Sequence, residues 1–83
     1  MKVHELQTDA EAWHGTDDGS KTAEVRFNDR DYAERDLLIL RCECGGGHEP
    51  LVAQVTGVFQ GGRYGIEPGY VLLSHRVIRT NRE

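Results

Sequence analysis

The chain has little of what marks a membrane or secreted protein. Its longest aliphatic run, Leu37–Leu40, is four residues long, whereas a membrane-spanning helix needs about 20 consecutive apolar residues. No apolar stretch follows Lys2 near the N-terminus, so no secretory signal peptide is expected. We therefore predict a cytoplasmic protein that does not interact with membranes.

Cysteine and net positive charge are also scarce. The only two cysteines, Cys42 and Cys44, do not make the framework of a disulfide-rich domain. Together with His48, and with His75 or His4 as a fourth ligand, they suggest a zinc site. However, Cys-x-Cys is tighter than the usual zinc spacing and no second pair follows, so we expect two reduced thiols in a strand and neither a metal nor another cofactor. The 10 Lys and Arg against 14 Asp and Glu give a net charge of -4, which lacks the basic field typical of tight duplex binders.

What is present is the pattern of a small, mainly β domain. The 83 residues, 37% hydrophobic and 29% charged, suit one globular domain with a basic tail over residues 76–83. Thr8 and Glu11 have the spacing of a capping box at the start of a short helix that ends at Gly15. Gly57 interrupts a strand and predicts a bend or bulge. Residues 67–70 fit a type II turn, in which Pro68 fixes φ and Gly69 supplies a positive φ. The clearest predicted strands are Thr22–Asn28, Leu37–Cys42, Leu51–Phe59 and Tyr70–Ser74, the last with a possible extension to Ile78. Val3–Leu6 is short and suits an edge strand. Five or six short strands favour a small, partly closed barrel, although periodicity alone fits an open sheet with a helix on one face equally well.

One predicted strand, within Ser20–Tyr32, has an unusually polar face. Apolar residues at positions 23, 25 and 27 alternate with polar residues at positions 22, 24, 26 and 28. Same-face neighbours lie roughly 7 Å apart, so Glu24 and Arg26 can reach the same small ligand or each other. Together with Lys21 they are candidates for binding a nucleotide. Arginine would contact a phosphate or a base edge, and glutamate would accept from an exocyclic amine. The alternative is an exposed cross-strand salt bridge, worth only about 0–1 kcal/mol.

Further candidate binding residues lie in loops. Asn28 and Arg30 come at the end of the polar strand and can present polar groups at the mouth of a cleft, although Asn and Asp there also suit a simple turn. Tyr64, in a glycine-rich loop, is a better candidate for stacking on a base than Tyr70. Tyr70, at the start of a strand, is the more typical core residue.

Four motifs are spread along the chain. They are a His-Glu-Leu start, a Lys-Thr-x-Glu-x-Arg-x-Asn-Asp-Arg block, an aspartate before an aliphatic strand, and a closing pattern rich in glycine and tyrosine. Their positions here are His4–Leu6, Lys21–Arg30, Asp36 and Gln60–Val71. Together they resemble a small phage and bacterial branch of the ASCH superfamily. Ser20 and Arg35 depart from that pattern, at positions where the branch has lysine and glycine.

The resemblance implies a fold and a ligand. The fold would be a PUA-like β-barrel of five to six strands with a short N-terminal helix. The ligand would be RNA, a nucleotide or a modified nucleoside, held in the cleft between barrel and helix. The binding residues would be Lys21, Glu24, Arg26, Asn28, Arg30 and Tyr64. If the protein is phage-encoded, it would act in the host cytoplasm.

Two other functions stay open. One ASCH branch is an amidohydrolase that removes the acyl group from an acetylated cytidine. It has a lysine at the position of Lys21, a threonine nucleophile at that of Glu24 and a glutamate in a later loop, where Glu67 is the only nearby carboxylate here. Because Glu24 replaces the hydroxyl, a non-enzymatic role is favoured, and the alternative is a hydrolase of a modified nucleoside that activates water through Lys21 and Glu24 or Glu67. The third reading is a phage accessory protein that binds a host protein through an exposed apolar patch, for which the surroundings of Trp13 are one candidate. Outside that reading, Trp13 is expected to anchor the short helix to the core.

Overall fold

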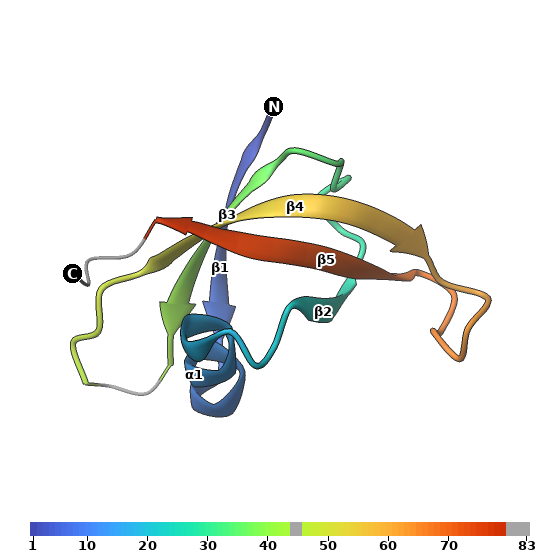
Figure 1. The fold of residues 1–83 in the computed structure, drawn as a ribbon. Helices are drawn as coiled ribbons and strands as arrows, with labels where there is room; N and C mark the ends of the chain where they lie inside the picture. Colours follow the sequence, from blue (N-terminus) through green and yellow to red (C-terminus); the bar gives the residue numbers. More distant parts are fainter. Residues whose placement is uncertain (44–45, 80–83) are drawn as a thin grey trace.

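The architecture is a curled sheet with one short helix. The computed structural model describes residues 1–43 and 46–79. Over these residues the element order is β1 (Val3–Thr8), α1 (Ala10–Asp18), β2 (Ala23–Phe27), β3 (Leu37–Cys42), β4 (Leu51–Gln60) and β5 (Tyr70–Arg79) (Figure 1). The prediction of a mainly β domain with one short helix is confirmed. Within the described ranges, no helix is long and apolar enough to cross a membrane.

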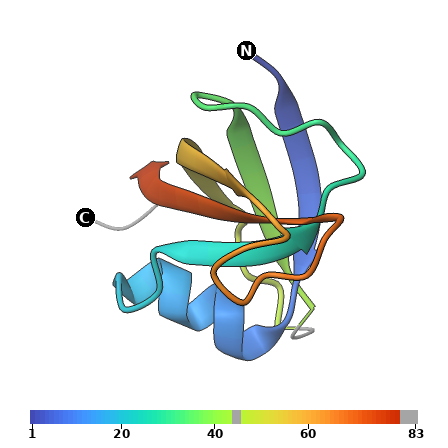
Figure 2. The same cartoon turned by 90° about the vertical axis from the view of Figure 1, so that its right-hand side faces the viewer.

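The five strands form one sheet in the order β1-β3-β4-β5-β2. β1 pairs in parallel with β3, and all other neighbours are antiparallel. The sheet curls into a half-barrel, and Figure 2 shows β2 turned back toward β1, next to α1. The two edge strands, β1 and β2, therefore face each other across the open side of the half-barrel, which we call the seam.

The core fills the hollow of the half-barrel. Its fully buried aliphatic side chains come mainly from β3, β4 and β5. Trp13 of α1 is also buried, and its indole Nε1 donates a hydrogen bond to the backbone oxygen of Leu40 at 3.1 Å. Trp13 thus fastens the helix to the sheet, which confirms the prediction that it anchors the helix. The apolar patch that the host-binding reading placed around Trp13 is not formed by this buried side chain. The core residues are Leu6, Trp13, Tyr32, Leu38, Leu40, Leu51, Ala53, Val55, Val71 and Leu73.

The helix begins one residue later than its capping signal suggests. Thr8 continues β1, where it lies opposite Cys42 of β3. The N-cap is Asp9, whose side chain accepts a hydrogen bond from the backbone N–H of Ala12 at 2.8 Å. The predicted capping box at Thr8 is therefore wrong, because pairing with a neighbouring strand holds Thr8 in extended conformation.

The helix also ends later than predicted. Gly15 lies inside α1, and the left-handed residue that ends the helix is Gly19, with φ of 86°. The N–H of Gly19 donates to the oxygen of Thr16 at 3.3 Å. A Cβ on Gly15 would lie 3.1 Å from Cβ of Lys21, so Gly15 allows the chain leading into β2 to pass close to the helix. The predicted stop at Gly15 is wrong.

The inward face of β2 is its polar face. Glu24 lies opposite Leu73 and Arg26 lies opposite Val71 in the pairing with β5, and both partners are fully buried. Because cross-strand neighbours share a face, the two ionic side chains enter the hollow of the half-barrel. Phe27, whose apolar character favours the core, is 58% exposed instead.

The β4–β5 hairpin follows its sequence signals closely. The register shifts between Val55 and Gly57, which confirms the predicted irregularity at this glycine. The predicted turn at residues 67–70 is confirmed as well, since the N–H of Tyr70 donates to the oxygen of Glu67 at 3.1 Å and Gly69 has φ of 91°. β5 continues to Arg79, one residue beyond the longer of its two predicted ends, Ile78.

Candidate functional site

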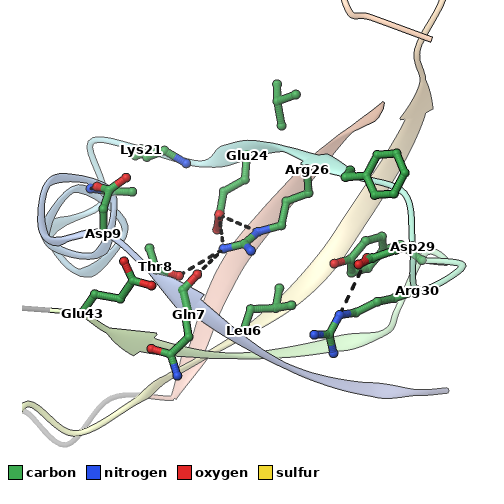
Figure 3. A pocket seen from close by; sticks show the side chains of 14 residues that line it. Leu6, Gln7, Thr8, Asp9, Lys21, Glu24, Arg26, Asp29, Arg30 and Glu43 are labelled. Atoms are coloured by element: carbon green, nitrogen blue, oxygen red, sulfur yellow. Dashed lines mark hydrogen bonds and ion pairs between the residues drawn. The ribbon is translucent and has the colours of Figure 1, made fainter. Parts of the chain in front are cut away.

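A pocket of about 680 Å³ opens at the seam. We call it the seam pocket, and Figure 3 shows the side chains around it. Its walls come from the end of β1, the start of α1, β2 and the connector that follows β2. Of the residues predicted to bind a ligand, Lys21, Glu24, Arg26 and Arg30 border this pocket. The other lining residues are Leu6, Gln7, Thr8, Asp9, Ala12, Val25, Phe27, Asp29, Tyr32 and Glu43.

Arg26 spans the seam from β2 to β1 (Figure 3). Its Nε and Nη2 atoms donate to Oε2 of Glu24 at 3.1 and 3.0 Å. Nη2 also donates to the backbone oxygen of Gln7 at 2.9 Å and to Oγ1 of Thr8 at 3.3 Å. Within the described part of the chain, its third nitrogen, Nη1, makes no hydrogen bond and remains available to a ligand.

A buried pair of titratable groups lies beneath Arg26. Glu24 is 7% exposed and His75 is 4% exposed. Nε2 of His75 is 3.8 Å from Oε1 of Glu24, too far for a hydrogen bond. Burial lowers the pKa of His75; the Glu24 carboxylate opposes this shift, and the positive charge of Lys21 adds to it. The imidazole is therefore neutral at neutral pH, and Arg26 is the positive partner of Glu24.

Lys21 and Arg30 lie at different ends of the pocket and have unused donors. The ammonium of Lys21 donates to the backbone oxygen of Ala23, which leaves two of its three N–H groups. Nε of Arg30 lies 3.8 Å from Oδ1 of Asp29, beyond hydrogen-bond distance. Both cations can therefore bind an anionic group without breaking a strong internal contact.

The remaining predicted residues lie outside the seam pocket. The backbone N–H of Asn28 donates to Gly69 at 2.9 Å, and its side-chain oxygen is buried without a hydrogen-bond partner among the described residues. Tyr64 is exposed on the β4–β5 connection, where the guanidinium of Arg63 lies 4.6 Å from its ring. Neither Tyr64 nor Glu67 lines the pocket, so of the two carboxylates considered for a hydrolase only Glu24 lies there with Lys21.

Among the described residues, the cysteine and histidine side chains considered as metal ligands do not form a metal site. Cys42 is disulfide-bonded, so the expectation that its thiol is reduced is wrong, and Cys44 lies outside the described residues. The ring of His48 packs on that of Trp13, with centroids 4.8 Å apart. In the ranges 1–43 and 46–79, no three His, Cys, Asp or Glu side chains are grouped as a metal would require.

Two of the motif residues named above form a structural pair. His4 and Asp36 are both buried, and Nε2 of His4 lies 2.8 Å from Oδ2 of Asp36. The backbone N–H groups of Lys2 and Ala33 donate to the same carboxylate, each at 3.0 Å. Burial raises the pKa of Asp36, but these hydrogen bonds outweigh it and bring the pKa to about 2. The pair ties the start of β1 to the turn before β3.

The residues that form the seam pocket and the His4–Asp36 pair lie within a range that matches a known family model. A family model described as "Domain of unknown function (DUF3850)" matches residues 3–75. The chain belongs to the DUF3850 family. The matched range includes every residue that lines the seam pocket of this DUF3850 domain. Among curated proteins, no sequence matches the chain.

Three residues near the pocket of this DUF3850 domain were not predicted as parts of a site. Val25 and Phe27 were assigned to the apolar side of their strand, yet both line the pocket. His75 was considered only as a metal ligand, yet it lies behind Glu24. The sequence does contain a signal that His75 is buried, because it continues the alternating apolar positions Val71 and Leu73 of one strand. All three side chains are buried in the structure.

Proposed function

We propose that the seam pocket binds a nucleotide or a short single-stranded RNA, and that the half-barrel is a PUA-like domain of the ASCH type. The observation that supports this best is the presence of Lys21, Arg26 and Arg30 around one open pocket of about 680 Å³. The exposed ring of Phe27 lies on the same pocket and offers a face on which a base can stack.

The hydrogen-bonding capacity of the pocket supports binding of a phosphate. Nη1 of Arg26, two N–H groups of Lys21 and the guanidinium of Arg30 have no internal hydrogen-bond partner among the described residues. Charged donors of this kind form short, strong hydrogen bonds to phosphate oxygens. Because the three cations come from both ends of the pocket, a ligand with phosphates some distance apart suits them better than a single small anion.

The acidic side chains of the pocket favour a nucleotide over a simple anion. Asp9, Asp29 and Glu43 also line it, and an inorganic anion would be repelled by them. A nucleotide carries phosphate oxygens that accept and exocyclic amines and ribose hydroxyls that donate, so both signs of charge in the pocket find a partner.

Fluorescence anisotropy with labelled single-stranded octanucleotides tests the proposal. The wild-type protein is expected to bind with an affinity that falls as salt is raised, because phosphate contacts release counterions. Arg30→Ala removes an exposed cation of the pocket and should weaken binding roughly threefold to tenfold. It should also reduce the slope of log affinity against log salt by about 0.7, the value for one phosphate contact to a single strand.

Arg63→Ala is the matched control. Arg63 is an exposed arginine on the β4–β5 connection and does not line the seam pocket. Its removal changes the net charge by the same amount but should leave the affinity close to that of wild type. The proposal fails if the wild-type protein shows no salt-sensitive binding, or if the two variants weaken binding equally.

A further inference from the structure

One edge of β2 is hydrogen-bonded to β5, and its other edge faces the seam pocket. The oxygen of Thr22 accepts from the N–H of His75, and the N–H of Asn28 donates to the oxygen of Gly69, both at 2.9 Å. These residues lie directly opposite each other, so even-numbered residues of β2 form the hydrogen-bonded pairs with β5. The N–H and C=O groups of odd-numbered residues therefore point toward the seam.

On the edge of β2 that faces the seam, Val25 is the residue whose backbone N–H and C=O both lack a hydrogen-bond partner among the described residues. The oxygen of Ala23 accepts from the ammonium of Lys21, and the oxygen of Phe27 accepts from the N–H of Asp29 at 2.9 Å. Within the described residues, no comparable bond involves the main chain of Val25. Since Val25 lines the seam pocket, one donor and one acceptor stand side by side at its wall.

The opposite wall of the seam is already occupied. On β1, the oxygen of Thr8 accepts from the N–H of Glu43 at 2.8 Å and so points toward β3. The oxygen of Gln7 points toward the seam and accepts from Arg26. An extended peptide inserted between β1 and β2 would have to displace Arg26 and leave Glu24 buried without its partner. A small planar group that bonds to β2 alone requires no such displacement.

We propose that the main chain of Val25 reads the base of the ligand. Its N–H donates to an acceptor, and its C=O accepts from a neighbouring donor, on the Watson–Crick edge of an unpaired nucleobase. Standard bases present adjacent donors and acceptors on that edge, and in a duplex the edge is occupied by the complementary base. The ring of Phe27, two residues along the strand, stacks on the same base. This inference rests on the proposed function and specifies an unpaired base recognised through the backbone.

The first test uses chemically modified RNA with the wild-type protein. Homo-octanucleotides of uridine, cytidine and adenosine are measured by anisotropy. Each RNA that binds is compared with the same strand methylated at the ring nitrogen of its Watson–Crick edge. Methylation should weaken binding roughly tenfold or more, because it removes one hydrogen bond and leaves a polar group unpaired. Uridine stays neutral when methylated and gives the cleanest comparison, whereas cytidine and adenosine also gain a positive charge. For uridine, methylation at carbon 5, away from that edge, is the control and should have little effect. If a strand methylated at the ring nitrogen binds as tightly as the unmethylated strand, the inference is overturned.

The second test removes the main-chain donor itself. Val25→Pro deletes the N–H without deleting a sheet hydrogen bond, since edge strands accept proline where the N–H faces away from the neighbouring strand. Val25→Ala keeps the N–H and is the matched control. Val25→Pro should bind RNA roughly tenfold more weakly than Val25→Ala, and the methylation effect should shrink in it. If the proline variant does not fold, the methylated RNAs decide. If no RNA binds the wild-type protein, the proposed function fails and this inference with it. If Arg30→Ala weakens RNA binding but base methylation does not change the affinity, only this inference fails.

Discussion

The pairing of Arg26 with Glu24 gives the sharpest prediction about the stability of the domain. Glu24 is 7% exposed, and its only hydrogen bonds within the described residues come from Arg26. Arg26→Ala would leave that carboxylate buried without a positive partner, which costs roughly 3–5 kcal/mol. This is a large part of the total stability of a small domain, which is roughly 5–15 kcal/mol. At roughly 4–8 °C per kcal/mol, the melting temperature should fall by about 12 °C or more.

The double variant Arg26→Met with Glu24→Leu separates stability from binding. Replacing a buried ion pair by apolar residues of similar volume is often neutral or stabilising, so its melting temperature should lie close to that of wild type. RNA binding should nevertheless be lost, because the guanidinium that faces the ligand is gone. Thermal unfolding followed by circular dichroism, together with anisotropy, measures both properties in the same samples.

Two results would refute this reasoning. If Arg26→Ala unfolds at the wild-type temperature, Glu24 does not depend on Arg26 and the buried pair is not as described. If the folded double variant binds RNA as wild type does, Arg26 makes no contact with the ligand.

Two further predictions concern pH. The pKa of Asp36 falls from its usual 3.8 to about 2, so this carboxylate contributes about 2 kcal/mol, fully present above its unfolded pKa and lost as the pH falls toward 2. Asp36→Asn should lower the free energy of unfolding by about that amount at neutral pH, and denaturant titrations that show no loss would contradict the role of the His4 contact. The pKa of His75 is lowered from 6.5, so protonation favours the unfolded chain and wild-type stability should decline as the pH falls below 6.5. His75→Gln should reduce that decline, and an unchanged pH profile would show that His75 is not buried in its neutral form.

The sequence signals that proved reliable are those set by local geometry. The turn at Gly69 needs a positive φ, and the bulge at Gly57 interrupts an otherwise regular strand, so both could be predicted from residue type and position. The signals at Thr8 and Gly15 were equally clear but failed. Pairing with β3 and the close passage of the chain beside α1 decide those positions, and neither contact can be read from neighbouring residues.

The site could be predicted only in part for a related reason. The spacing of Glu24 and Arg26 places them on one face of a strand, but the curl of the sheet decides whether that face lies inside or outside. Apolar side chains would ordinarily take the inner face, and here the ion pair takes it while Phe27 lies outside. The role suggested for Val25 depends on which edge of β2 is free. That edge is known only once the strand order places β2 at the border of the sheet.

An isotope-labelled sample of the protein, titrated with an unlabelled single-stranded octanucleotide and followed by amide NMR, tests the central claim most directly. The largest shift is expected at the amide of Val25, with smaller shifts at Thr8, Arg26 and Arg30 around the seam pocket. Shifts confined to Tyr64 and the glycine-rich β4–β5 connection, with Val25 unchanged, would contradict it.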